Sequence, residues 1–553
     1  MKFNSNSSSG ISFRHEYLMT YRSHMLFIIC FIGIAMVYLT HLGKVPVHFT
    51  SDECRRGLVA MEMNLSGDYV MPTLNGEPYL NKPPLYSWII SASYTLFGKY
   101  SAYALRFPVI VSILLHGLLI FFIVKRFCNV SVAALSALAY MTNGRTLMFD
   151  SMLGLLEHTL ALLMYLGFMV IFIYGEKKKY LLLLTLSYFI TALGFLIKGL
   201  PAVAHQGIAL LVYFVFSGQT KRLFSPEHLT GILVFFLVLS AYYIPFIGYA
   251  HIDPENLFST ILHESSKRYY FQDVQNFFHI IVDYPVDFIY HFLPWTLFII
   301  LMLRKDFLAV AHENKFIWYN LLLFLANSPI YWLAALKNPH YLYFLLPLLF
   351  PFLFFIYFKS GPADVRVRIL DGMLGLGIGI MIIASGYIPF IEKIAEVSGL
   401  WPKSIILSLA FTGLLLLFLY MRDMRLYVFV AAILFVRLAF NWFVIPSRVI
   451  DETKHTAIAT EVYELVKDEP LFIMAEFPAG YYDGITYYLE KYRNSILRIN
   501  REVDYNAYYL VDEVYLNKYP HHQYLQFPFM YADNNLRFDK EMFLVKFQVT
   551  DTH

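Results

Sequence analysis

Charged residues are scarce in this chain, and their scarcity excludes most soluble folds. Of its 553 residues only 15% are Asp, Glu, Lys or Arg, whereas 58% are hydrophobic and the mean hydropathy is +0.54. A water-soluble globule rarely has such a composition. The formal net charge of +3 is too small and too dispersed to indicate a nucleic-acid partner. The composition therefore predicts an integral membrane protein.

Paired cysteines, metal-ligand spacings and phosphate loops are also missing. Cys30, Cys54 and Cys128 have no paired or metal-type spacing, so no disulfide framework is indicated. The histidines lack the His-x-x-x-His spacing that places two ligands on one helix face. The glycine-rich stretch 372–379 lies inside an apolar run, where small residues serve helix packing. Neither a metal centre nor a nucleotide-binding loop is indicated.

Apolar runs of roughly 20 residues, the length that a helix needs to cross the hydrocarbon layer, fill most of the chain. The first covers residues 25–39, which we interpret as a signal anchor with the polar N-terminal tail inside. The others are 103–124, 131–148, 157–174, 180–197, 200–217, 228–249, 286–303, 315–335, 340–358, 369–390, 402–420 and 424–445. The predicted fold class is therefore mainly α, a polytopic bundle of about 13 transmembrane helices.

Basic residues follow alternate runs, for example Lys125-Arg126, Lys177-Lys178-Lys179 and Arg304-Lys305. By parity they share the side of the N-terminal tail, which the positive-inside rule places in the cytoplasm. The remaining connections, and everything after the last run, are then expected outside.

Charge returns in two segments, both outside by this parity. In the first outside loop, 43–102, residues 52–65 have a helical rhythm and residues 85–97 form an amphipathic run, so we expect helices on the membrane surface. After residue 450, a helix-like stretch at 452–467 is followed by strand-like stretches at 470–475, 506–511 and 541–548. We predict a transmembrane domain, 1–450, and a small outside α/β domain, 451–553.

Polar residues that the positive-inside rule does not explain gather on the outside face. They are Asp52, Lys82, Asp150, Lys198, Glu264, Arg268, Lys337 and His340. Ionisable residues at a membrane edge are costly, so they mark a candidate site. An outside site has no nucleotide sugars within reach, and an activated substrate would have to arrive on a lipid.

The first two of these residues have both a chemical and a structural interpretation. Asp52 is either a general base or cation-stabilising carboxylate, or a charge that ends a helix at the interface. In Asn81-Lys82-Pro83-Pro84 the prolines fix the backbone, so Lys82 either pairs with a lipid phosphate or snorkels from a turn.

The same choice applies further along the chain. Asp150 either pairs with Arg145 or is a second acidic group of the site, and Lys198 either binds a lipid phosphate or snorkels. Glu264 and Arg268 lie in the outside loop 250–285, where a solvated loop face is the alternative to ligand contacts.

Another set of candidates opens the run 340–358. Lys337, His340 and Tyr343 are placed to reach one outer pocket, whereas an aromatic belt explains the tyrosine without any function.

One combined pattern in the first outside loop is specific. Asp52-Glu53-x-Arg55 is followed by Asn75-Gly76-Glu77-Pro78-Tyr79 and by Lys82-Pro83-Pro84-Leu85. This resembles the corresponding loop of the bacterial aminoarabinose (lipid A) transferases, which belong to a superfamily of polyprenyl-phosphate-dependent glycosyltransferases that includes protein O-mannosyltransferases. The similarity continues through Asp150 and Lys198-Gly199 and covers roughly residues 20–450.

The resemblance implies a C-type glycosyltransferase bundle in the bacterial inner membrane, with surface helices and a periplasmic C-terminal domain. It also implies that Asp52 is the catalytic carboxylate, with Asp150 as a second one, and that Lys82 contacts the donor phosphate. Arg55 and Lys198 would help to hold a donor or acceptor phosphate. We count Glu53, Glu264, Arg268, Lys337, His340 and Tyr343 as further candidates for substrate binding.

The resemblance does not extend to zinc. The relatives have a glutamate before Lys-Pro-Pro as part of a zinc-binding feature, whereas this chain has Asn81 there and Ser265 where the histidine partner is expected. We therefore do not carry the zinc site over to this chain, and no other cofactor is indicated.

The expected reaction moves a sugar from a polyprenyl (undecaprenyl) phosphate to a lipid A-like acceptor at the periplasmic face, with inversion. Phosphate is a good leaving group that needs cationic contacts more than a general acid, so Asp52 serves the nucleophile. The alternatives are transfer to secreted proteins and a flippase of lipid-linked sugars. A flippase predicts ionisable residues near the midplane of both halves, whereas here they gather on one face, with Arg437 as the main exception.

Overall fold

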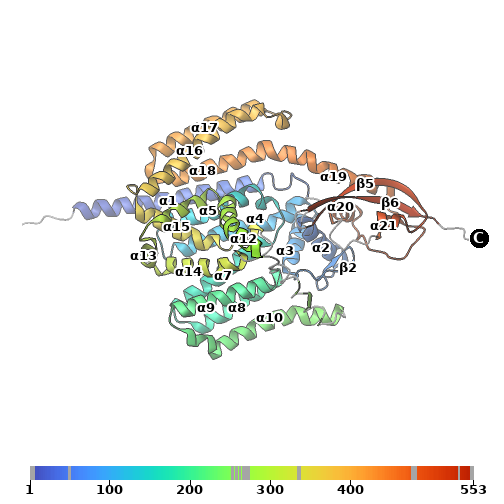
Figure 1. Cartoon of the computed structure of the whole chain (residues 1–553), viewed down its shortest axis with the longest axis horizontal. Helices are drawn as coiled ribbons and strands as arrows, with labels where there is room; N and C mark the ends of the chain where they lie inside the picture. The colour runs from blue at the N-terminus through green and yellow to red at the C-terminus, as the bar shows by residue number, and fades with distance from the viewer. Residues whose placement is uncertain are drawn as a thin grey trace, which may run out of the picture.

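The computed structural model describes residues 7–47, 52–250, 255, 259–260, 263, 274–332, 338–474, 483–533 and 536–548. Most of them are helical, and the helices run along the long axis of the molecule, with a β-sheet at one end (Figure 1). The helices of the bundle are α1 (Ser7–Leu39), α4 (Ala102–Val124), α5 (Val130–Thr142), α6 (Gly144–Met148), α7 (Glu157–Glu176), α8 (Tyr180–Lys198), α9 (Leu200–Phe216), α10 (Pro226–Ala250), α12 (Val274–His291), α13 (Phe307–His312), α14 (Lys315–Trp332), α15 (Leu346–Ser360), α16 (Val365–Tyr387), α17 (Leu400–Tyr420) and α18 (Arg425–Ala439).

Every apolar run of the sequence contains helix. Within the described part of the chain, eight helices are long and apolar enough to cross a membrane, and three shorter apolar helices accompany them. Two predicted runs are divided: 131–148 into α5 and α6 at Asn143, and 286–303 into the end of α12 and the 3-10 helix η3 (Trp295–Leu303) at Pro294. The mainly helical, multi-pass fold is confirmed, whereas the number of about 13 spans stays a prediction.

The basic connections meet at one end of the bundle. Lys315 pairs with Glu176 at 2.7 Å and Lys359 with Glu313 at 2.8 Å. Asn314 donates to the carbonyl of Phe127 at 2.8 Å. These contacts join connections far apart in sequence, as the alternation of basic loops requires.

The first outside loop folds at the opposite end, next to the sheet (Figure 1). It contains α2 (Asp52–Ser66), the short strands β1 (Thr73–Leu74) and β2 (Glu77–Pro78), and α3 (Leu85–Phe97). Asn75 and Gly76 both have positive φ, at 54° and 75°, which suits the tight turn of a hairpin. Glu62 of α2 accepts hydrogen bonds from both of their N–H groups, at 2.5 and 3.1 Å, and so holds the hairpin against α2.

The C-terminal unit continues directly from the membrane helices. α18 passes through the π-helical turn η8 (Phe440–Val444) into α19 (Ile445–Val466), so the predicted helix 452–467 is the end of a longer one. A four-stranded sheet follows, in the order β3 (Leu471–Met474), β4 (Tyr508–Asp512), β6 (Leu536–Phe547) and β5 (His521–Asp533). β3 and β4 are parallel, and the other pairs are antiparallel. The strand β5 and the helix α20 (Asp483–Arg493) were not predicted.

α20 attaches this unit to the first outside loop. Tyr488 donates its hydroxyl to the carbonyl of Val47 at 3.1 Å, and Ile499 N–H donates to the carbonyl of Asn75 at 3.2 Å. α2 and α20 approach so closely at Gly57 that a Cβ there would lie 2.9 Å from the ring of Tyr487. The C-terminal unit therefore covers the segment that carries the predicted site.

Candidate functional site

The start of α2 carries Asp52, Arg55 and Arg56 at the end of the bundle next to the sheet (Figure 1). Asp52 is 61% exposed, and Arg55 Nη1 lies 3.5 Å from its Oδ1. Arg56 is buried and donates from Nη1 to the hydroxyl of Tyr79 at 3.1 Å. Partial burial opposes ionisation of Asp52, but the charges of Arg56 and Arg55 outweigh it and lower its pKa below 3.8. Asp52 is therefore ionised at neutral pH.

Lys82 lies close to this carboxylate. It is half-buried in the loop that ends at Pro84, where α3 begins. Its ammonium adds to the charges that lower the pKa of Asp52. The structure thus brings Asp52, Arg55 and Lys82 together, as the loop pattern predicts.

A second group forms where α7 begins and α8 ends. Lys198, the last residue of α8, donates to Glu157 Oε1 at 2.9 Å, and its Nζ lies 3.9 Å from the ring centroid of Tyr341. Glu157 is the first residue of α7, and Gly199 turns the chain from α8 into α9 at a φ of 81°. A lysine between a carboxylate and an aromatic face is held in one orientation.

A small cavity borders this second group. It is lined by Glu157, Lys198, His340, Tyr341 and Tyr343, together with apolar residues of α7. Nδ1 of His340 is buried and has no hydrogen-bond partner within the described part of the chain. The cavity therefore has cationic, carboxylate and imidazole groups in its wall.

The third group contains Asp150 and reaches the same cavity through Tyr343. The Tyr343 hydroxyl donates to Asp150 Oδ2 at 2.6 Å, and Arg145 Nε donates to the same oxygen at 3.1 Å. His158 stacks on the ring of Tyr343 at 4.0 Å. Asp150 is 1% exposed and forms the pair with Arg145 that was one of its two interpretations.

The first and second groups are neighbours. Burial lowers the pKa of Arg56, but Tyr79, Asp52 and Glu157 together raise it above its usual value. This residue of α2 therefore interacts with carboxylates of both groups. The site is thus one region, with carboxylates and cations alternating across it.

Glu53 lies apart from this region, although it directly follows Asp52. It is fully buried, and Arg106 donates to it from Nε at 2.6 Å and from Nη2 at 3.0 Å. The N–H of Gly154 donates to the same carboxylate at 2.9 Å. We propose that Glu53 holds the loop in place and does not contact substrate.

Three predicted residues cannot be placed. Glu264, Arg268 and Lys337 lie outside the residues that the structure describes, as does Ser265. Within the described ranges, no group of three or more His, Cys, Asp or Glu side chains is arranged to hold a metal ion.

Sequence reasoning missed Glu157, Arg56, Tyr341 and, in the C-terminal unit, Asp483. A signal existed for Glu157, because it is a lone carboxylate at the first position of a predicted span, the property that singled out Asp150. Asp483 had none, because its partner Arg55 lies at a sequence separation of 428 residues.

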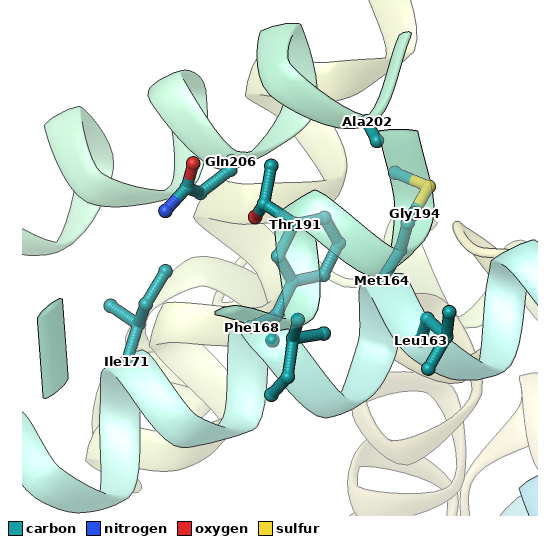
Figure 2. Close-up of a pocket in the computed structure, with 10 residues that line it drawn as sticks. Leu163, Met164, Phe168, Ile171, Thr191, Gly194, Ala202 and Gln206 are labelled. Carbon is teal, nitrogen blue, oxygen red and sulfur yellow. The ribbon is translucent and has the colours of Figure 1, made fainter. Parts of the chain in front are cut away.

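An apolar pocket lies next to the cavity, and Met164 lines both. Figure 2 shows its side chains, from α7, α8 and α9, around a common space. Gly167, Gly194 and Ala202 are small residues in the wall of this pocket. Thr191 and Gln206 supply its few polar side-chain atoms. A small charged cavity and a small apolar one thus lie next to each other along α7.

Comparisons with known proteins agree with this architecture. The family model described as dolichyl-phosphate-mannose-protein mannosyltransferase matches residues 81–244. An uncharacterized protein of Aquifex aeolicus is 24% identical over 57% of this chain and 60% of its own length. The undecaprenyl phosphate-alpha-4-amino-4-deoxy-L-arabinose arabinosyl transferase of Edwardsiella ictaluri is 28% identical over 31% of this chain and 32% of its own. The enzyme of that name from Serratia proteamaculans is 25% identical over 70% and 69%.

A solved structure extends the likeness to the whole fold. ArnT from Cupriavidus metallidurans, bound to undecaprenyl phosphate, superposes with a TM-score of 0.66 at 17% identity, over 95% of this chain and 98% of that one. The fold class is thereby confirmed, including the small C-terminal sheet. The resemblance to the aminoarabinose transferases and their superfamily is confirmed as well.

Proposed function

We propose that this protein is a glycosyltransferase that moves a sugar from a polyprenyl phosphate, undecaprenyl phosphate in a bacterium, to a lipid acceptor. The observation that carries the proposal is an ionised, exposed Asp52 beside Arg55, Arg56 and Lys82, near the cavity that Glu157 and Lys198 line. Cations so placed, at the end of a bundle of apolar helices, suit a lipid substrate with an anionic head. The named relatives act on or bind undecaprenyl phosphate, which favours the same donor.

The charges divide between the two sides of the reaction. The acceptor oxygen attacks the anomeric carbon, the bond from that carbon to the phosphate oxygen breaks, and the electron pair leaves with the phosphate. We assign Lys82, Arg55, Arg56 and Lys198 to the phosphate side, where cations stabilise the leaving group. Asp52 accepts the proton of an acceptor hydroxyl, or orients an acceptor that is already an anionic phosphate.

The remaining site residues have supporting roles in this proposal. Glu157 fixes the ammonium of Lys198 at 2.9 Å, and Asp150 fixes the hydroxyl of Tyr343 at 2.6 Å. The resemblance to the aminoarabinose transferases implies that the transfer inverts the anomeric configuration. We further propose that the protein lies in the inner membrane, with this site and the C-terminal unit, residues 451–553, on the periplasmic side.

Transfer to secreted proteins is the second candidate, because the matching family model is named for a protein mannosyltransferase. Mass spectrometry of lipid A, other envelope glycolipids and glycoproteins, from cells with and without the gene, separates the two acceptors. A flippase moves labelled donor across vesicles and forms no product.

The test of the site is transfer from a synthetic undecaprenyl-phosphate sugar by the purified protein, with product measured by mass spectrometry. We expect Asp52→Asn to lower kcat about 10²- to 10³-fold, the usual effect of losing a charge-stabilising or proton-accepting group. Asp68→Asn is the matched control. Asp68 lies in the same loop and only accepts hydrogen bonds from the N–H groups of Val70 and Met71, which Asn also accepts. Full activity of Asp52→Asn would remove the role assigned to Asp52.

A further inference from the structure

One residue of the C-terminal unit reaches the first turn of α2. Asp483, the first residue of α20, is buried, and its Oδ2 accepts a hydrogen bond from Arg55 Nε at 2.7 Å. Its backbone carbonyl also accepts a hydrogen bond from Cys54 Sγ at 2.9 Å. Two successive residues of α2 are thus held by one residue of a distant segment.

Arg55 lies between two carboxylates that differ in exposure. The side chain of Asp483 is 4% exposed and that of Asp52 is 61% exposed. Asp483 is also the nearer partner, at 2.7 Å compared with 3.5 Å for Asp52. Because a guanidinium is planar and its donors form a rigid fork, the buried partner determines where the remaining N–H groups point.

The packing of α20 makes this contact rigid. A Cβ on Gly57 of α2 would lie 2.8 Å from the hydroxyl of Tyr94 and 2.9 Å from the ring of Tyr487. Tyr487 is one helical turn after Asp483 on the same face of α20. The close approach of α2 and α20 at Gly57 therefore fixes the position of Asp483 along α2, next to Arg55.

We propose that Asp483 is a positioning residue for the reaction: it engages Arg55 from the C-terminal unit and thereby sets the orientation and basicity of Asp52. The inference rests on the proposed transferase function. With Asp483 present, the charge of Arg55 is divided between two carboxylates, and Asp52 remains turned toward the site. Without it, Arg55 pairs with Asp52 alone, which makes Asp52 a weaker base and turns it away from an acceptor.

The sign of the pH effect follows from the groups that face Asp52. These are Arg55 and Arg56 of α2, Lys82 of the next loop, Glu157 of α7 and, through Arg55, Asp483 of α20. Asp52 and Asp483 repel each other, so each raises the pKa of the other. Removing the charge of Asp483 lowers the pKa of Asp52 further. The acid limb of the pH–rate profile then moves to lower pH, while the plateau of kcat falls.

The experiment measures transfer from a synthetic undecaprenyl-phosphate sugar by the full-length protein as a function of pH and donor concentration. We expect Asp483→Asn to lower kcat about 10- to 100-fold while the donor KM stays within about threefold, because Lys82, Arg56 and Lys198 still hold the donor phosphate and mainly orientation is lost. Asp483→Glu keeps the charge and should restore part of kcat. Since Asp483 acts through Arg55, the double variant D483N/R55Q should be no slower than R55Q.

The matched control is Arg501→Gln. Arg501 also joins the C-terminal unit to the first outside loop, through an exposed ion pair with Glu77 at 3.3 Å, but it does not touch Arg55. Its kcat and pH profile should equal those of the wild type. This comparison separates a loss of docking from a loss of positioning.

A D483N variant with the kcat and the pH profile of the wild type would overturn the inference, as would additive effects in D483N/R55Q. If melting curves show that D483N does not fold, wild-type kcat in D483E, which changes the 2.7 Å geometry, would overturn it. Absence of transfer by the wild type itself would instead count against the proposed function.

Discussion

Two buried acid–base pairs of similar length have different surroundings. Glu53–Arg106 measures 2.6 Å and Glu157–Lys198 measures 2.9 Å. Arg106 also donates to the carbonyls of Leu42, Val45 and Pro46, and the side chains of the pair are at most 2% exposed. Glu157–Lys198 borders a cavity beside His340. An ion pair enclosed by backbone groups serves the fold, whereas one that lines a cavity can meet a ligand.

The largest effect is expected from breaking the enclosed pair. The double variant Glu53→Gln with Arg106→Met leaves the three buried carbonyls that Arg106 binds without a donor. We expect a loss of at least about 3–5 kcal/mol in the free energy of unfolding, enough to prevent accumulation of folded protein. Size-exclusion chromatography of a fluorescent fusion measures the amount of folded protein. Folded but inactive protein would instead indicate that Glu53 takes part in catalysis or substrate binding.

The same exchange at the cavity should separate activity from folding. Glu157→Gln with Lys198→Met removes both charges, and replacing a whole pair by uncharged groups is often nearly neutral for stability. We expect the melting temperature to change little and kcat/KM for the donor to fall about 10²- to 10³-fold. If the melting temperature and the transfer activity fall together, the Glu157–Lys198 pair is structural, and the contrast with Glu53–Arg106 is wrong.

A smaller effect is expected from the carboxyl pair between α2 and α20. Glu62 and Glu490 are both fully buried, and burial, followed by the charge of Glu62, raises the pKa of Glu490 well above 4.5. A raised folded-state pKa gives stability that is complete below the unfolded pKa and is lost as pH rises through the folded pKa. The melting temperature should therefore fall as pH rises above about 4.5.

Glu490→Gln should remove this slope and raise the melting temperature at pH 8. The gain is about 1.4 kcal/mol for each pH unit between the unfolded and folded pKa values. Glu461→Gln, an exposed residue of α19, controls for the change of residue type. An unchanged slope in Glu490→Gln would show that Glu490 does not carry the proton that the pair requires.

The smallest effect is expected from Glu77→Gln, which removes the exposed pair with Arg501. Its side chains are 42% and 73% exposed, and such pairs contribute about 0.2–1 kcal/mol. Thermal unfolding at two salt concentrations measures it. A loss above about 2 kcal/mol would mean that exposed charges, and not the buried contacts of α20, attach the C-terminal unit.

The sequence predicts elements well where apolar spacing or a fixed turn determines them. The run 85–97 coincides with α3 because Pro84 precedes it. α20 was missed although Ile485, Leu489 and Tyr492 repeat at helical spacing, because its buried residues also include the polar Asp483, Tyr487 and Glu490. Only the partners on α2 explain why these residues are inside.

The same limit applies to the candidate site. Asp52, Lys82, Lys198 and Tyr343 were predicted because local pattern and membrane parity mark them. The carboxylate that pairs with Lys198 is Glu157, because the end of α8 lies next to the start of α7. The sequence alone does not give this distance between two helix ends. Glu53, next to Asp52, points to Arg106 because α2 is a helix, in which successive side chains face different directions.

The helix that begins as α18 and ends as α19 continues without a break from the bundle into the C-terminal unit (Figure 1). At a rise of 1.5 Å per residue it forms a rod of about 60 Å, of which only part fits within a hydrocarbon layer of about 30 Å. A bilayer of different thickness tilts such a rod. Because α20 packs against both α19 and α2, a tilt of this rod would place a force on the contact between Asp483 and Arg55.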